Sequence, residues 1–220
     1  YFNIGASSWL AQTTSVIEAI GDAVVSGNYI EGAGVCAQAI TISSRCSVTE
    51  NWVLSSGGCG IYIGSGESIV NGNVVNGPAE AINGTANDGN IVSNNRFTSA
   101  TLPGALPFGG EFSGNVYNIG AMSFTRNSVN RELLIRDCTF VGNFEFTGSN
   151  MSISGCDFTG TTIIQSRLDS LPLQMSGVRF HGPTTLVACY ADGCVVESDG
   201  STAAFVGNTF LTGCTMTNCA

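Results

Sequence analysis

Acidic side chains are the residues of this sequence best suited to acid–base chemistry, and they are few. The chain has 220 residues, of which 16 are Asp or Glu, and no two Asp are adjacent or one residue apart. Glycoside hydrolysis uses two nearby carboxylates, whose separation sets the stereochemical outcome. The candidates are Asp157, Arg179 beside it, and Glu145, which lies between two Phe and should point outward. A lone carboxylate cannot be both acid and base, so these are weak catalytic candidates and we favour a function without catalysis.

Other catalytic chemistries have little support in the sequence. His181 is the only His, and no Gly-x-Ser-x-Gly segment that could hold a serine nucleophile occurs. No Cys-x-x-Cys pair or Cys/His cluster occurs, so we expect no metal site and no cofactor. The nine Cys are an odd number, so at least one thiol is unpaired within the chain. We expect mostly buried, reduced thiols, with a few disulfides as the alternative. The states of Cys36, Cys59, Cys214 and Cys219 stay open.

Composition excludes several classes of partner. The formal net charge is −9, the pI is about 4.3, and the seven basic residues are scattered Arg with no Lys. Nucleic acids and anionic membrane surfaces are therefore not expected partners, since both need clustered cations. A mean hydropathy of +0.24 argues against disorder. No apolar run approaches the roughly 20 residues of a membrane span. Because the chain begins at Tyr1, we expect a processed product or a fragment of a longer chain.

A six-residue unit recurs along the chain. It reads apolar, two small or polar residues, Asn or Cys, any residue, then an apolar β-former, as in residues 25–30 and 70–75. Its fourth position holds, in successive copies, Asn28, Asn51, Asn73, Asn95, Asn115, Cys138 and Cys156. Its sixth position becomes aromatic along the chain, with Phe97, Tyr117, Phe140, Phe158, Phe180 and, in a last copy, Phe210.

The spacing of these units predicts the fold. A period near 22 residues is too short for most helical repeats and suits a coil of three short strands. Gly, Asn and Ser accept the left-handed conformations that corners need, and alternation in the strands points Val, Ile and Phe inward. A stacked Asn can bond the backbone of neighbouring coils through its amide. We therefore predict an all-β fold, a single-stranded right-handed parallel β-helix of about ten coils of 18–23 residues.

Segments at the ends and in the middle have their own predictions. Apolar residues at helical spacing from Ser8 to Ile20 predict a short helix that caps the first coil, with an irregular first coil as the alternative. Residues 98–110 contain two Pro and predict a loop that projects from the coil. The expected organisation is an entry segment at 1–23, the β-helix at 24–210, and a tail or last partial coil at 211–220.

An outward row of side chains is apolar in the first coils, which is unexpected for a free surface. This row, just after the Asn position, reads Tyr29, Trp52, Val74, Arg96 and Val116. It could contact a second copy in a trimer, form a platform for sugar rings, or lie beneath the helix or the loop. With Tyr62, which should point outward from the next strand, Tyr29, Trp52 and Arg96 are the candidates for binding or interface residues. In later coils the same row places Asp157 beside Arg179, which also predicts an exposed ion pair worth under about 1 kcal/mol.

Through these units, over about residues 24–210, the chain resembles the right-handed parallel β-helix superfamily. This is the pectate-lyase-like group that includes bacteriophage tailspikes and tail appendages. The resemblance implies polysaccharide lyases, glycoside hydrolases, epimerases or viral receptor-binding proteins, many of them trimeric, but the catalytic residues of the family cannot be matched here.

From the resemblance and the composition we expect a structural or receptor-binding component of a phage tail that contacts host surface glycans. A polysaccharide lyase or hydrolase and a bacterial surface adhesin are the alternatives. The expected partners are further copies of the chain, other virion proteins and polysaccharide. The expected location is the virion tail or the extracellular space.

Overall fold

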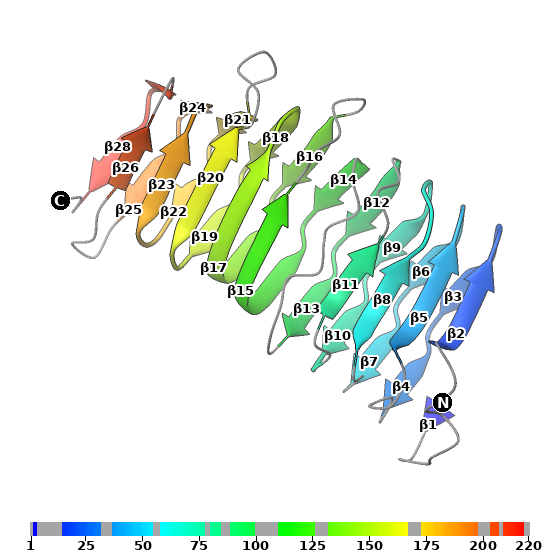
Figure 1. Cartoon of the computed structure of the whole chain (residues 1–220). Helices are drawn as coiled ribbons and strands as arrows, with labels where there is room; N and C mark the ends of the chain where they lie inside the picture. The colour runs from blue at the N-terminus through cyan, green and yellow to red at the C-terminus, as the bar shows by residue number, and fades with distance from the viewer. Residues whose placement is uncertain are drawn as a thin grey trace.

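A computed structural model shows that the chain folds as a parallel β-solenoid (Figure 1). The structure describes residues 2–3, 15–31, 37–54, 58–77, 80–84, 89–99, 110–125, 132–166, 173–197, 203–206 and 209–217. All strand pairs in it are parallel, and each strand pairs with the equivalent strand of the next turn, here called a rung. Within the described residues there are strands and turns but no helix, so the predicted all-β solenoid is confirmed.

The strands form three long faces. Face 1 contains β1 (Phe2–Asn3), β4 (Tyr29–Glu31), β7 (Trp52–Leu54), β10 (Val74–Asn76), β13 (Arg96–Ser99), β15 (Val116–Thr125), β17 (Thr139–Gly148), β19 (Asp157–Thr159), β22 (Arg179–Phe180), β25 (Val195–Glu197) and β28 (Thr215–Thr217). Face 2, toward the viewer in Figure 1, contains β2 (Ser15–Ile20), β5 (Gln38–Ser43), β8 (Cys59–Ile63), β11 (Glu80–Gly84), β20 (Thr162–Ser166), β23 (Thr184–Val187) and β26 (Ala203–Val206). Face 3 contains β3 (Val24–Ser26), β6 (Ser47–Thr49), β9 (Ile69–Asn71), β12 (Asn90–Ser93), β14 (Gly110–Ser113), β16 (Leu133–Arg136), β18 (Met151–Ser154), β21 (Leu173–Ser176), β24 (Cys189–Asp192) and β27 (Phe210–Thr212).

The corner between faces 1 and 2 changes character along the solenoid. In the first rungs β4, β7 and β10 are three residues long, and face 2 is a separate four-stranded sheet. In β15 and β17, by contrast, one strand of ten residues runs from face 1 onto face 2. The first part of β17 pairs with β19 and its last part pairs with β20. Faces 1 and 2 are thus joined through β17 into one sheet in the second half of the chain.

Two predictions about segments outside the repeat need correction. The predicted helix from Ser8 to Ile20 is wrong for Ser15–Ile20, which form β2 and pair with β5; the rest of it lies outside the described residues. Ile17 lies beside Ile40 in this pairing, so the apolar residues serve a strand rather than a helix face. The predicted loop at 98–110 is shorter than expected, because its first two residues belong to β13 and Gly110 belongs to β14. Residues 100–109 lie outside the described residues.

A ladder of hydrogen-bonded side chains runs along the corner between faces 3 and 1. Asn51 donates from its backbone N–H and from Nδ2 to Oδ1 of Asn73, both at 2.9 Å. Asn73 repeats this toward Asn95, and its Nδ2 also donates to the carbonyl of Val48 at 2.9 Å. The same contacts join Asn28 to Asn51 and Asn95 to Asn115. From Asn51 to Asn115 these amides are at most 2% exposed, so the buried donors are paired by rung-to-rung bonds.

The residue before each ladder position turns the corner with a positive φ. The set is Gly27, Glu50, Gly72, Asn94, Gly114, Asp137, Gly155, Gly177, Gly193 and Gly213. At Gly114, where φ is 62°, a Cβ would lie only 2.7 Å from Oδ1 of Asn94 on the neighbouring rung. Gly therefore serves both the left-handed backbone and the close stacking at this corner.

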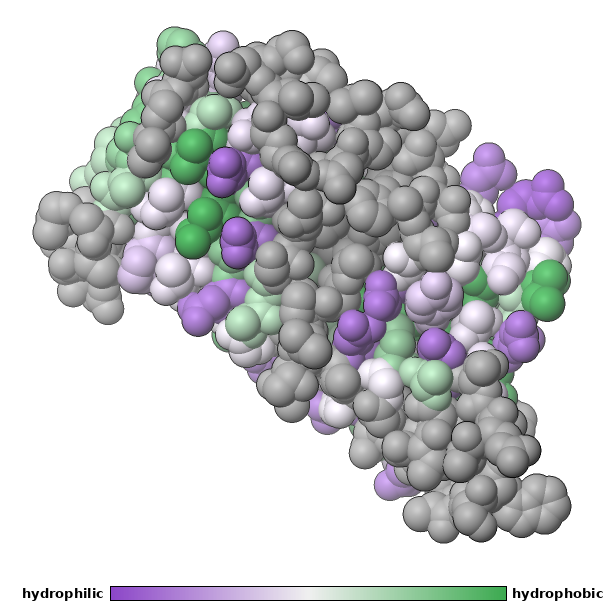
Figure 2. All heavy atoms as spheres, viewed as in Figure 1, coloured by the Kyte–Doolittle hydropathy of each residue, from purple (hydrophilic) through white to green (hydrophobic). Residues whose placement is uncertain are grey.

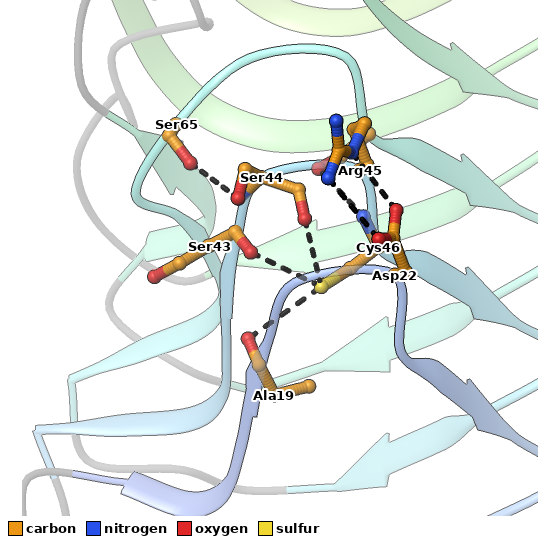
Figure 3. A network of polar contacts seen from close by, with 8 residues as sticks. Ala19, Asp22, Ser43, Ser44, Arg45, Cys46 and Ser65 are labelled. Carbon is orange, nitrogen blue, oxygen red and sulfur yellow. Dashed lines mark hydrogen bonds and ion pairs between the residues drawn. The ribbon is translucent and has the colours of Figure 1, made fainter.

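In the second half of the chain, thiols occupy the ladder positions and keep one part of the Asn pattern. The Asn95 amide donates to the carbonyl two residues before it and to Val70 on the previous rung. The Cys138 thiol makes the equivalent pair of contacts, to Arg136 at 3.2 Å and to Phe112 at 3.6 Å. Cys46, at another corner, likewise faces the carbonyls of Ala19, Ser43 and Ser44 (Figure 3). A Cys thus supplies a weak donor to the corner carbonyls.

A column of stacked aromatic rings lines the inner side of face 1. Phe97, Tyr117, Phe140, Phe158 and Phe180 stack with centroid distances of 5.2, 5.0, 4.7 and 5.4 Å, and all five are fully buried. Among the described residues, the hydroxyl of Tyr117 has no hydrogen-bond partner. Burial, reinforced by the nearby Cys138 and Cys156, raises the pKa of Tyr117 well above its ordinary value. The ring fills the column, but its hydroxyl is desolvated without compensation.

Phe210 does not belong to this column, and that prediction is wrong. The next inward positions after Phe180 are Val196 and Met216, and Phe210 lies on face 3 beside Tyr190. The hexamer at 205–210 matches the repeat pattern in composition, but its Phe210 pairs with Tyr190 on face 3. The real rungs carry Cys194 and Cys214 at the ladder position, each following a Gly with positive φ.

We predict that Asn73→Ala lowers the free energy of unfolding by about 2–4 kcal/mol, because in a buried site it removes the acceptor of the Asn51 backbone N–H and the side-chain amide that donates to the Val48 carbonyl. Chemical denaturation measures the change. The matched control is Asn71→Ala, which removes one amide on the outer side of the same corner and should cost under about 1 kcal/mol. If both variants lost the same free energy of unfolding, the buried Asn ladder would not be the main source of stability at this corner.

We predict that Tyr117→Phe stabilises the protein by about 1 kcal/mol, because it removes an unpaired buried hydroxyl and keeps the stacked ring. Thermal and urea unfolding should both shift upward. Tyr29→Phe, which removes a partly exposed hydroxyl bonded to Glu31, serves as the control and should change stability by under about 0.5 kcal/mol. A destabilised Tyr117→Phe variant would mean that the hydroxyl has a partner.

Candidate functional site

The catalytic candidates Asp157 and Arg179 are neighbours on face 1, but the Asp157 carboxylate contacts a different residue. The two are register partners in β19 and β22. Asp157 Oδ1 instead lies 3.6 Å from Nε2 of His181, and Nδ1 of His181 lies 3.1 Å from Oε2 of Glu197. The imidazole therefore bridges two carboxylates from rungs on either side. Sequence reasoning noted His181 as the only His and did not connect it to Glu197.

This carboxylate–imidazole–carboxylate cluster lies on an open surface. The side chains of Asp157, His181 and Glu197 are 39%, 38% and 54% exposed. Solvent screens such contacts, so each is worth under about 1 kcal/mol. Glu145 is not part of the cluster: it is exposed on the face-2 part of β17, beside Ile163. Within the described residues, no group of three His, Cys, Asp or Glu side chains is arranged to hold a metal ion.

The predicted binding or interface residues are divided between two faces. Tyr29 and Trp52 are register partners on face 1, with ring centroids 6.5 Å apart and planes tilted by 53°. Trp52 is 51% exposed, and Arg96 follows two rungs later in the same row. Tyr62 is on face 2, where it lines a hollow of about 270 Å³ with Glu80 and Asn83. The four residues therefore cannot form one site.

Face 3 carries a better-formed hollow near the C-terminal end of the solenoid. Its volume is about 330 Å³, and its lining includes Ser152, Gln174, Ser176, Tyr190, Asp192 and Phe210. The rings of Tyr190 and Phe210 stack at 4.8 Å with planes 12° apart, and they are 46% and 53% exposed. The hollow forms because small side chains on β18 and β21 lie beside two large outward rings on β24 and β27.

The chemistry of this hollow combines an apolar platform with convergent polar groups. The two stacked rings form an apolar wall against which a ring-shaped ligand can pack. Gln174 offers a donor and an acceptor, Asp192 offers a carboxylate, and the serines offer hydroxyls. Small-molecule sites in general pair apolar walls with a few placed polar groups. The arrangement suits a polyhydroxylated ligand.

Sequence reasoning missed this hollow because it misplaced the last rungs. Once Cys194 and Cys214 are recognised as ladder residues, Tyr190 and Phe210 each fall four positions before one of them. That shared offset places both rings in one outward row, as their register pairing shows. The signal was therefore present in the Gly-Cys dipeptides at 193–194 and 213–214.

Comparisons with family models, with curated proteins and with solved structures find no match to this chain. The parallel β-solenoid is consistent with the superfamily that the repeat resembles. In the described part of the chain, no helix is long and apolar enough to span a bilayer.

Proposed function

We propose that this chain is a structural solenoid that binds glycans through the face-3 hollow. The observation that carries the proposal is the stacked, half-exposed pair Tyr190 and Phe210 beside Gln174 and Asp192. Aromatic faces pack against the C–H faces of sugar rings, and amide, carboxylate and hydroxyl groups bind their hydroxyls. Parallel rungs hold these groups on a rigid surface, which lowers the entropy lost on binding.

The setting we propose is a tail spike or appendage of a bacteriophage, in which the chain contacts host surface glycans and associates with further copies of itself. Strands stacked rung on rung make a rigid, elongated solenoid, which suits a spike or appendage. The exposed apolar residues of face 1, above all Trp52 and Val116, support self-association along that face. Seven free thiols among the described residues fit a protein that folds in a reducing cytosol.

A second candidate function is polysaccharide cleavage, and the cluster of Asp157, His181 and Glu197 favours it. Two carboxylates on either side of an imidazole could act as acid and base in a glycosidase. The cluster is on face 1, whereas the aromatic hollow is on face 3, so the two surfaces can be tested separately.

We predict that Tyr190→Ala and Phe210→Ala each weaken binding to a recognised polysaccharide by about tenfold or more, equivalent to about 1.4 kcal/mol. The measurement is affinity electrophoresis or calorimetry with a panel of bacterial capsular and lipopolysaccharide glycans. Trp52→Ala is the matched control, because it removes an equally exposed ring from another face. Unchanged affinity in the Tyr190 and Phe210 variants would contradict the site, and no binding to any glycan would contradict the function.

The same glycans, incubated with the protein, distinguish binding from cleavage. Release of reducing or unsaturated sugar that disappears in Asp157→Asn or Glu197→Gln would favour the enzyme. Binding without release, unchanged in these variants, would favour the structural function.

A further inference from the structure

In the second half of the chain, the ladder positions hold two pairs of neighbouring thiols, separated by a valine. After Cys138 and Cys156 the ladder position holds Val178, and then Cys194 and Cys214 follow on the last two rungs, as the register of the adjoining strands shows. Val178 has no sulfur, so the thiol neighbour of Cys194 within the described ladder is Cys214. All of these cysteines are free thiols in the structure.

The sulfur of Cys214 is directed toward the rung that carries Cys194. Cys214 Sγ lies 3.4 Å from the carbonyl of Ala191, which is on the rung of Cys194 and three residues before it. Cys194 Sγ faces the carbonyl of Asp192 on the same rung at 3.6 Å. Neighbouring strands are about 4.8 Å apart, within the Cα separation of about 4.4–6.8 Å that a disulfide spans.

The two pairs differ in their access to solvent. Cys138 and Cys156 are each 1% exposed and have rungs on both sides. Cys214 is only half-buried, because no described rung covers it. Leu211 and Met216, which occupy inward positions of this last rung, are 36% and 46% exposed for the same reason. Figure 2 shows apolar side chains gathered at this end of the solenoid.

We propose that Cys194 and Cys214 form an oxidation site. A small-molecule disulfide, such as glutathione disulfide, oxidises the two thiols to a Cys194–Cys214 disulfide, which joins the last described rung covalently to the one before it. The proposed disulfide does not depend on the proposed glycan site. It does involve the rung that carries Phe210, because Phe210 and Cys214 belong to the same rung.

The chemistry proceeds in two exchange steps. The Cys214 thiolate attacks one sulfur of glutathione disulfide, a new S–S bond forms, and glutathione thiolate leaves and takes up a proton. Cys194 then loses its proton and attacks the Cys214 sulfur, which expels a second glutathione. Two protein thiols are thus oxidised and one glutathione disulfide is reduced to two glutathiones. Burial raises the pKa of Cys194 to about 11, so the second step should be the slower one and should accelerate as the pH rises.

The test uses the whole, folded protein. Reduced protein is incubated with glutathione disulfide at several pH values, remaining thiols are alkylated, and the digest is mapped by mass spectrometry. We expect one crosslinked peptide that joins Cys194 to Cys214, with Cys138 and Cys156 alkylated only after unfolding. Cys194→Ser should stop the reaction at the mixed disulfide on Cys214, and Cys214→Ser should abolish both steps. The conservative Ser keeps a donor for the corner carbonyls, and circular dichroism checks the fold.

Two controls make the result decisive. Cys138→Ser should leave the Cys194–Cys214 disulfide unchanged. Cys219→Ser, which removes the thiol nearest to Cys214 in the sequence, should also leave it unchanged. The oxidised protein should also unfold at a higher urea concentration than the reduced one, and Cys194→Ser should lose that difference. A link from Cys214 to Cys219, a mixed disulfide that never closes, or a Cys214 that does not react in the folded protein would each overturn the proposal.

Discussion

The rung-to-rung hydrogen bond of the corner amides is the interaction on which the rest of the structure depends. Each Asn from Asn28 to Asn95 binds the next one both through its backbone N–H and through Nδ2. These bonds hold equivalent residues of successive rungs directly above one another. In-register stacking then aligns the aromatic column inside and the outward rows on the surface, because side chains alternate along each strand. The position of a surface site in this fold therefore depends on the register that the ladder sets at one corner.

The replacement of Asn by Cys changes what the ladder can do. An amide both donates to the corner carbonyls and accepts from the next rung, whereas a thiol mainly donates weakly. The second half of the chain compensates by other means. There β15 and β17 run through the corner between faces 1 and 2, and Phe144 and Phe146 pack edge-on against Phe140. Polar pairing thus dominates the first half and aromatic packing the second.

The sequence was sufficient to predict the solenoid and the ladder from Asn28 to Cys156, because the hexamer and its spacing reflect strict steric needs at one corner. It was insufficient for the last rungs, where the hexamer at 205–210 competes with those around Cys194 and Cys214, and strand pairing shows that the two Cys continue the repeat. The apolar pattern before Ile20 fits a helix or a strand equally well until Ile17 is seen beside Ile40. The hollow required knowing which outward residues are neighbours, and the sequence shows this only once Cys194 and Cys214 are recognised as ladder residues.

The uneven spacing of the ladder residues has a consequence for how such a chain can diversify. Ladder positions are as close as 16 residues, from Val178 to Cys194, and as distant as 23, from Asn28 to Asn51. Among the described residues, only the corner between faces 3 and 1 is held by stacked side chains of this kind along the whole solenoid, so the other connections can lengthen or shorten without disturbing the alignment. Insertions there would add new recognition loops, and exchanges at outward positions would alter specificity, while the buried half of every strand stayed the same. The architecture thereby separates mutations that affect folding from mutations that affect recognition.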